Sequence, residues 1–275
     1  MKRVAETLCV ARSNLAERMR GRGKPRGPYT KADDAGLLAL VRRFVDERPT
    51  YGYRRITALV NRELARQGRP TINRKRVYRI MQRNALLLER HSARRQGRTH
   101  DGKVMVMRSN LRWCSDALEF TCWNGAVIRL AFIIDAFDRE IIAWTAVCGA
   151  GISGSDVRDM MLEGVEQRFG RPQAPHRIEL LSDNGSPYTA KETRDLATAL
   201  NLVPCFTPVR SPESNGLCEA FVKTFKRDYV RVNPLPDAPA VLGQIAGWIT
   251  DYNEIHPHSA LRMRSPREFI RAQAP

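Results

Sequence analysis

The stretch that decides the fold runs from Arg112 to Val147 and reads RWCSDALEFTCWNGAVIRLAFIIDAFDREIIAWTAV. It consists of runs rich in β-branched and aromatic residues, separated by the turn signals WNG and DAFDRE. This pattern predicts three consecutive antiparallel strands. The segments that follow alternate between helix-like and strand-like patterns, which is typical of a mixed α/β layer structure.

The alternating segments downstream can be placed from their ends. The segment 153–170 has the spacing of a helix, with Ser153 or Ser155 as its cap and Gly170 as its stop. The pattern then predicts a buried strand that runs into a turn at 176–188, a helix at 190–201 and a short strand from 202.

Charge is distributed unevenly along the 275 residues, whose net charge is +17. Residues 1–108 hold 28 Lys and Arg against 9 Asp and Glu, whereas the rest of the chain is close to neutral. A segment this basic indicates a polyanionic partner, and nucleic acid is favoured because basic side chains displace counterions from phosphates. An anionic membrane surface is the weaker alternative, since no basic amphipathic anchor is evident.

Neither a membrane span nor a secretory signal is found in the sequence. No apolar run approaches the roughly 20 residues that a span requires, and the N-terminus lacks an apolar region followed by a cleavage site. We therefore expect a cytoplasmic protein. None of the six cysteines forms a CxxC pair, so reduced thiols are favoured over disulfides and a cysteine metal site is not expected.

The basic half contains three segments with helical periodicity between residues 33 and 87, followed by an aperiodic basic linker. Three short helices with a basic third one favour a helix-turn-helix whose last helix enters a DNA groove. The alternative is a basic helix on a small bundle. The candidate DNA-binding residues on the third helix are Arg74, Lys75, Arg76, Arg79 and Arg83.

These patterns divide the chain into five parts. The expected domains are a basic flexible arm that includes a short helix (1–30), an all-α helix-turn-helix domain (31–90), a basic linker (91–108), a catalytic core (109–235), and a C-terminal helix and tail (236–275).

Three acids stand out in the second half. Asp116 lies inside the first predicted strand, Asp183 at the end of a buried strand, and Glu219 one to two turns into a later helix. Each has a purely structural alternative. Asp116 could pair with a buried arginine, Asp183 could cap its turn, and Glu219 could pair with Lys223 at i+4.

Taken together, the acids suit phosphoryl transfer. Mg²⁺ prefers oxygen ligands, and two such ions held about 3.5–4 Å apart can activate an attacking oxygen and stabilise a leaving one. Carboxylates on strands and a helix supply such ligands rigidly. Asp116, Asp183 and Glu219 are therefore both the candidate catalytic residues and the candidate metal ligands.

The chain resembles the DDE transposases and retroviral-type integrases. Thirty-five residues separate Asp183 from Glu219, and the two acids lie in SDNGSPY and SPESNGLCEAFVKTFKRDY. The nearest resemblance is to the second reading frame of insertion-sequence transposases of the frameshifting copy-out/paste-in family, the family numbered three. The segments that carry it are NLRWCSD (110–116), PTYGYRRITALVNREL (49–64), INRKRVYRIMQRNALLLER (72–90) and DYNEIHPHSALRMRSPREFI (251–270).

The resemblance implies an RNase H-like mixed-sheet core and a DDE-type polynucleotidyl transferase. Its reaction would be cleavage at transposon ends and joining of the 3′-hydroxyl to target DNA, with Mg²⁺ as cofactor and Mn²⁺ able to substitute. Further DNA contacts are expected near the third acid, at Asn215, Lys223, Lys226 and Arg227.

Members of that family act as fusions with an upstream frame that carries its own helix-turn-helix and coiled coil. This chain begins at Met1 and shows no sustained heptad. The implied partners are therefore transposon-end and target DNA, further copies of the chain on that DNA, and the upstream-frame product or fusion. Two other functions stay open: a non-catalytic DNA-binding regulator, and a structure-specific nuclease on the same fold.

Overall fold

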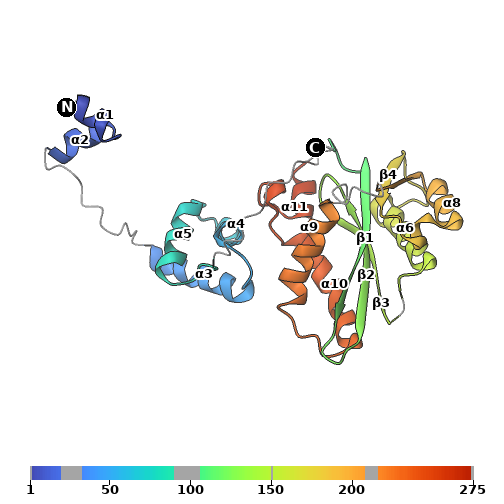
Figure 1. Ribbon diagram of the computed structural model, residues 1–275. Helices are drawn as coiled ribbons and strands as arrows, with labels where there is room; N and C mark the ends of the chain where they lie inside the picture. Colours follow the sequence, from blue (N-terminus) through green and yellow to red (C-terminus); the bar gives the residue numbers. More distant parts are fainter. Residues whose placement is uncertain (1, 20–32, 90–105, 150, 208–215, 274–275) are drawn as a thin grey trace. The chain divides into compact units, whose positions relative to one another are not determined.

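The computed structural model describes residues 2–19, 33–89, 106–149, 151–207 and 216–273 (Figure 1). The chain forms two compact units, residues 1–40 and 41–275. The first unit contains α1 (Lys2–Thr7), α2 (Arg12–Met19) and the beginning of α3 (Asp34–Glu47). The predicted arm therefore includes two short helices, while residues 20–32 and most of the predicted linker lie outside the described residues.

Two helices that follow α3 match the predicted periodicity. They are α4 (Tyr53–Arg66) and α5 (Arg74–Arg83). Asn73 caps α5, because its Oδ1 accepts a hydrogen bond from the backbone N–H of Lys75 at 2.8 Å. One face of each helix is buried, through Ile56, Leu59, Val60 and Leu64 in α4 and through Val77, Ile80 and Met81 in α5.

Five strands form one mixed sheet in the order β3-β2-β1-β4-β5. The strands are β1 (Arg112–Thr121), β2 (Val127–Asp135), β3 (Ile141–Cys148), β4 (Ile178–Ser182) and β5 (Leu202–Phe206). The first three pair antiparallel, which confirms the prediction from the deciding stretch. β4 pairs parallel with β1 and with β5. Figure 1 shows the sheet between two groups of helices.

Each face of the sheet has its own apolar core. α6 (Gly154–Phe169), α7 (Ser186–Thr189) and α8 (Lys191–Ala199) pack on one face. α9 (Gly216–Phe225), the π-helical turn η2 (Lys226–Val230) and α10 (Ala238–Glu254) pack on the other. Alternation along β1 serves both faces, since Trp113 joins the first core and Cys114 the second.

The helix ends follow the predicted signals. Ser153 forms a capping box with Asp156, and Gly170 ends α6 in the left-handed region at φ 62°. Ser265 caps the last helix, α11 (Pro266–Arg271), which follows the 3-10 turn η3 (Ser259–Leu261).

The long helix α10 belongs to the core beside α9. Val241, Ile245 and Ile249 are buried in the same cluster as Leu118 of β1. Burying each such side chain contributes about 1.5–3 kcal/mol, so the C-terminal part of the chain stabilises the sheet. All six cysteines are free thiols. Within the described residues, no helix combines the length and apolar character needed to cross a bilayer.

Candidate active site

Asp116 and Asp183 lie on neighbouring parallel strands. In the register of β1 and β4, Arg112 is opposite Glu179 and Cys114 is opposite Leu181. Continuing that register two residues further places Asp116 beside Asp183, which directly follows β4. Two neighbouring positions, one within β1 and one just past the end of β4, are thus both occupied by acids.

Asp116 lies on the face of β1 that α9 covers. Cys114, two residues earlier, is buried in the same apolar cluster as Cys218 of α9. The thiol of Cys218 forms a hydrogen bond with that of Cys114, and this bond lowers the pKa of Cys114. This contact anchors α9 beside β1. Cys218 directly precedes Glu219, and Cys114 lies two residues before Asp116.

Burial raises the pKa of Asp116, and the negative charges of Asp183 and Glu219 raise it further. A hydrogen bond from the backbone N–H of Ala117 to its Oδ1, at 2.8 Å, partly opposes this rise. The three acids therefore repel one another electrostatically. Such a cluster favours protons or cations in the space between its members.

The turn after β4 holds Asp183 at the surface. Its Oδ1 accepts a hydrogen bond from the backbone N–H of Gly185 at 3.1 Å, which is the structural role that the sequence left open. A Cβ at Gly185 would lie 3.0 Å from that oxygen, so glycine permits the close approach. Tyr188 of α7 anchors the turn to β1, because its Oη lies 2.7 Å from Oγ of the buried Ser115.

Glu219 is exposed on the first turn of α9 and pairs with Lys223, whose Nζ lies 2.7 Å from its Oε2. Across the described residues, no three His, Cys, Asp or Glu side chains lie close enough to hold a metal ion together. In this structure Asp116 and Asp183 are neighbours, while the carboxylate of Glu219 is turned to Lys223.

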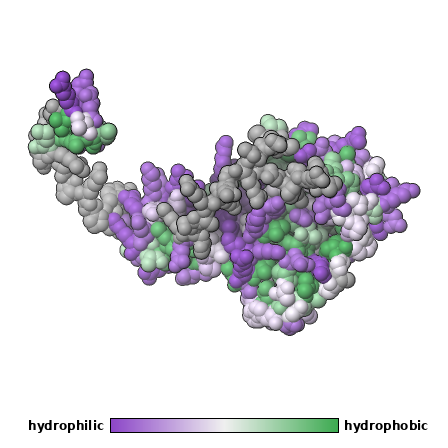
Figure 2. Space-filling view, viewed as in Figure 1, coloured by the Kyte–Doolittle hydropathy of each residue, from purple (hydrophilic) through white to green (hydrophobic). Residues whose placement is uncertain are grey.

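The candidate DNA-binding residues differ in exposure. Arg74, Lys75 and Arg83 are exposed on α5, whereas Arg76 and Arg79 are half-buried. Figure 2 shows a mostly hydrophilic visible surface over α3, α4 and α5.

Near the third acid the candidate contacts also differ. Lys223 is exposed and Lys226 is half-buried. Arg227 is bound to Asp228, with its Nε 2.6 Å from Oδ1 and its Nη2 2.7 Å from Oδ2. Asn215 lies outside the described residues.

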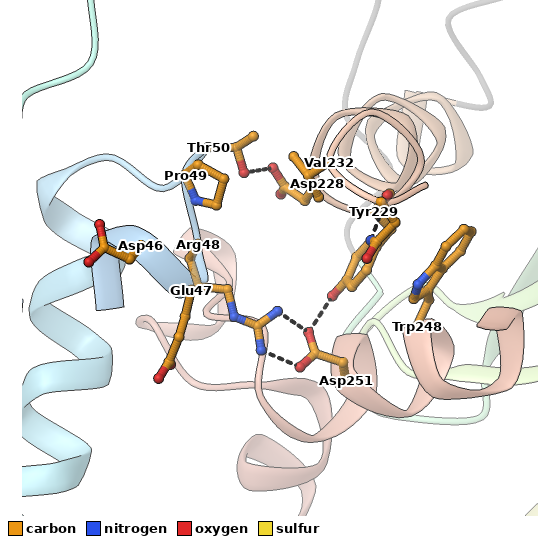
Figure 3. A pocket seen from close by; sticks show the side chains of 11 residues that line it. Asp46, Glu47, Arg48, Pro49, Thr50, Asp228, Tyr229, Val232, Trp248 and Asp251 are labelled. Atoms are coloured by element: carbon orange, nitrogen blue, oxygen red, sulfur yellow. Dashed lines mark hydrogen bonds and ion pairs between the residues drawn. The ribbon is translucent and has the colours of Figure 1, made fainter. Parts of the chain in front are cut away.

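A second polar cluster was missed by the sequence reasoning. It joins the segment before α4 to η2 and α10, and it surrounds a pocket of about 300 Å³ (Figure 3). Arg48 binds both carboxylate oxygens of Asp251, with Nη1 2.9 Å from Oδ2. Thr50 donates to Asp228 at 2.6 Å. The sequence offered no signal for it, because Asp228 directly follows two basic residues in FKRDYV and Asp251 stands in the polar stretch TDYNE.

The residues of the C-terminal signature have structural roles. Asn253 is buried and bonds both backbone groups of Ile141 at the start of β3. His256 and Tyr252 are buried with stacked rings. These contacts are packing contacts within the protein.

Three families match the chain. Residues 107–212 and residues 202–266 match two families that are each described as an integrase core domain, and residues 31–94 match the HTH-like domain. These matches cover the sheet, the helices on both of its faces, and the helices that precede it.

Known proteins share much of the sequence. An uncharacterised protein of insertion element IS136 from Agrobacterium tumefaciens is 74% identical over 194 residues, which are 70% of this chain and 100% of the relative. Transposase InsD of insertion element IS2 from Escherichia coli is 50% identical over 243 residues, which are 88% of this chain and 80% of the relative.

Among solved structures, the Mos1 transposase catalytic domain with raltegravir and Mg is 17% identical, with a TM-score of 0.43 over 51% of this chain and 71% of that chain. The sequence relatives and the family matches agree with the mixed sheet and the HTH-like helices. The chain therefore belongs to the insertion-sequence transposases that join an HTH-like domain to an RNase H-like integrase core, and it is a DNA transposase.

Proposed function

We propose that Asp116, Asp183 and Glu219 form the acid triad of a DDE-type polynucleotidyl transferase that depends on Mg²⁺. The observation that carries this proposal is the register of β1 and β4, which sets Asp116 beside Asp183, while Cys218 holds the start of α9 against the same face of β1. The charges of Asp183 and Glu219 raise the pKa of Asp116, and a bound cation would offset that repulsion.

The donor set fits a hard divalent cation. The three side chains offer only oxygen acceptors, which Mg²⁺ and Mn²⁺ accept. Asp116 and Asp183 would hold the ions from the rigid sheet, and Glu219 would complete the site from α9. When bound, the two ions would polarise the scissile phosphate and lower the pKa of the attacking hydroxyl or water.

The chain's own residues would position the DNA. Exposed Arg74, Lys75 and Arg83 of α5 would bind the phosphates of the transposon end. Once Glu219 turns toward Asp116, Lys223 would lose its ion-pair partner. Its ammonium group would then neutralise a DNA phosphate beside the acids. Tyr188 keeps the Asp183 turn against β1 and so preserves the spacing of the two strand acids.

The reaction would be hydrolysis at the transposon end followed by attack of the freed 3′-hydroxyl on target DNA. In the first step water would attack the phosphorus and the P–O3′ bond would break, which leaves a free 3′-hydroxyl and a 5′-phosphate. In the second step that 3′-hydroxyl would attack a target phosphodiester, whose own 3′-oxygen leaves as a hydroxyl. Neither step forms a covalent bond to the enzyme. We also propose that the chain acts as a homo-oligomer on DNA, alone or with the product of an upstream frame.

Replacement of Asp183 with Asn tests the triad. The probe is a labelled duplex of the DNA that flanks this gene, incubated with Mg²⁺ and a second duplex as target. We expect Asp183→Asn to abolish strand cleavage and 3′-end joining while DNA binding persists, because the amide keeps the shape and loses the charge.

Asp195→Asn is the matched control, since Asp195 is exposed on α8. Cleavage by Asp183→Asn at the rate of Asp195→Asn would remove the triad. Cleavage by the unaltered chain without joining to the second duplex would instead favour a nuclease.

A further inference from the structure

Asp228 is a buried carboxylate held by residues far away in the sequence. Its side chain is 1% exposed. Thr50 donates to its Oδ1 at 2.6 Å, and Nη1 of Arg55 lies 3.1 Å from its Oδ2. Thr50 lies 178 residues earlier, in the segment before α4, and Arg55 lies 173 residues earlier, in the first turn of α4. The neighbouring Arg227 also binds both oxygens of this carboxylate. A charged group this deeply buried requires such partners, because an unpaired buried charge is costly.

The same carboxylate belongs to the helix that carries Glu219. α9 ends at Phe225 and passes directly into η2, with Phe225 itself in the right-handed helical region. Glu219 and Asp228 are thus about 13 Å apart along one helical run. The π-helical turn at Asp228 is of a kind that occurs mostly as single turns at functional sites.

A second contact holds the same turn. Tyr229, the next residue, donates from its Oη to Oδ2 of Asp251 at 2.9 Å. Arg48 binds the same carboxylate with two nitrogens. Figure 3 shows both sets of contacts: Thr50 bonds to Asp228, and Asp251 bonds to both Arg48 and Tyr229. Two adjacent residues of η2 are therefore tied to the segment that leads into α4.

We infer that Asp228 is a positioning residue through which Thr50 and Arg55 set how the helix of Glu219 lies against β1. The inference rests on the proposed role of Glu219. In this structure Glu219 pairs with Lys223, so its carboxylate must leave that pair to approach Asp116, and the placement of α9 against β1 sets how far it has to reach. Thr50 and Arg55 hold the opposite end of that helical run, so DNA binding by the helix-turn-helix is communicated to the third acid.

Thr50→Val tests the coupling, because it removes the hydroxyl that donates to Asp228 and nearly keeps the side-chain shape. The first measurement is backbone hydrogen exchange of the free full chain. We expect exchange to accelerate in α9 and not in α6, which packs on the other face of the sheet. The second is single-turnover cleavage of the flanking-DNA duplex at saturating protein with Mg²⁺, which we expect to fall about tenfold, the loss typical of a hydrogen bond to a charged group.

Two controls make the result specific. Thr250→Val removes a hydroxyl that bonds only within α10, at 2.9 Å from the carbonyl of Ala246, and should leave both measurements unchanged. Arg55→Gln should act like Thr50→Val, whereas Arg54→Gln, one exposed residue earlier, should not. The dissociation constant for the duplex should be the same for Thr50→Val and the unaltered chain.

The outcomes separate this inference from the proposed function. Unchanged hydrogen exchange in α9 of Thr50→Val overturns the inference. An equal rise of exchange in α6 and α9, or a weaker affinity for the duplex, also overturns it, because each indicates a merely structural role. If the unaltered chain fails to cleave with Mg²⁺, the proposed function fails, but the exchange measurement still decides the coupling.

Discussion

The hydroxyl of Tyr51 lies 2.7 Å from Nδ1 of His256, in a buried contact between residues 205 positions apart. Burial lowers the pKa of His256 well below its usual range, and nearby His258 and Arg55 lower it further. The imidazole is therefore neutral, and it shares one hydrogen bond with the tyrosine hydroxyl. This contact joins the PTYGYRR segment to the C-terminal signature.

Tyr51→Phe should destabilise the chain by about 1–3 kcal/mol, because it leaves a buried ring nitrogen of His256 without its hydrogen-bond partner. Urea unfolding measures the loss. Tyr53→Phe is the matched control, since its hydroxyl bonds at 3.3 Å to an exposed arginine, and it should change stability by less than about 0.5 kcal/mol. Equal stability of the two variants would contradict a stabilising role for the Tyr51 contact.

Stability should fall on acidification. Burial lowers the pKa of His258 to about 3, and the pKa of His256 is also lowered. The unfolded chain takes up protons at these residues below about pH 6.5, whereas the folded chain does not. The unfolded state then binds more protons, so stability is complete above that pH and declines as the pH falls toward 4.

His258→Gln isolates the effect. Over pH 6 to 4 its free energy of unfolding should decline less steeply than that of the unaltered chain, by up to about 1.4 kcal/mol per pH unit. Burial, together with the charge of Asp138, raises the pKa of Asp135 to about 6, which acts in the opposite direction but cancels in this difference. His176→Gln, at an exposed histidine, should keep the original slope. Identical slopes for both variants would exclude His258 as a source.

Asn253 should be irreplaceable even by aspartate. Its Oδ1 accepts from the N–H of Ile141 and its Nδ2 donates to the carbonyl of Ile141, both at 2.9 Å. Asn253→Asp keeps the acceptor but sets a carboxylate against that carbonyl, and we expect a loss of at least about 2 kcal/mol in urea unfolding. Gln82→Glu, at an exposed position of α5, serves as control. A tolerated Asn253→Asp would mean that β3 does not need this anchor.

Local signals explain why much of the fold could be predicted from the sequence. The antiparallel strands follow from alternating apolar residues between two turn signals, and α6 follows from Ser153 and Gly170 at its ends. The position of Asp183 at the end of a buried strand predicts an acid at the edge of the sheet. Each of these predictions depends on residues that lie within about one helix or strand of one another in the sequence.

The remaining contacts depend on packing between distant segments. Nothing near Asp228 in the sequence indicates that its partners are Thr50 and Arg55, because they lie more than 170 positions away. The residue types of Thr50 and Arg55 would also suit an exposed turn. The sequence left two roles open for Glu219, a metal ligand and the partner of Lys223 at i+4, and the spacing did not decide between them. Which partner a carboxylate takes depends on burial and on competing charges, and spacing does not specify these.

The exposure of the α5 side chains separates two groups of candidate phosphate contacts. Arg74, Lys75 and Arg83 are free to reach a DNA backbone, whereas Arg76 and Arg79 lie partly in the protein. Each alanine substitution in the exposed group should reduce the slope of log affinity against log salt by about 1. Filter binding of the flanking-DNA duplex across salt concentrations measures that slope.

Arg66→Ala is the control on the same domain, because its side chain is 81% exposed but lies at the end of α4 rather than on α5. It should leave the salt slope unchanged if α5 is the helix that meets the phosphates. Lys75→Ala should weaken binding to flanking DNA and to unrelated DNA by similar factors, since phosphate contacts carry no sequence information. A loss confined to the flanking sequence would mean that Lys75 contacts bases, and a slope that changes only in Arg66→Ala would move the DNA surface to α4.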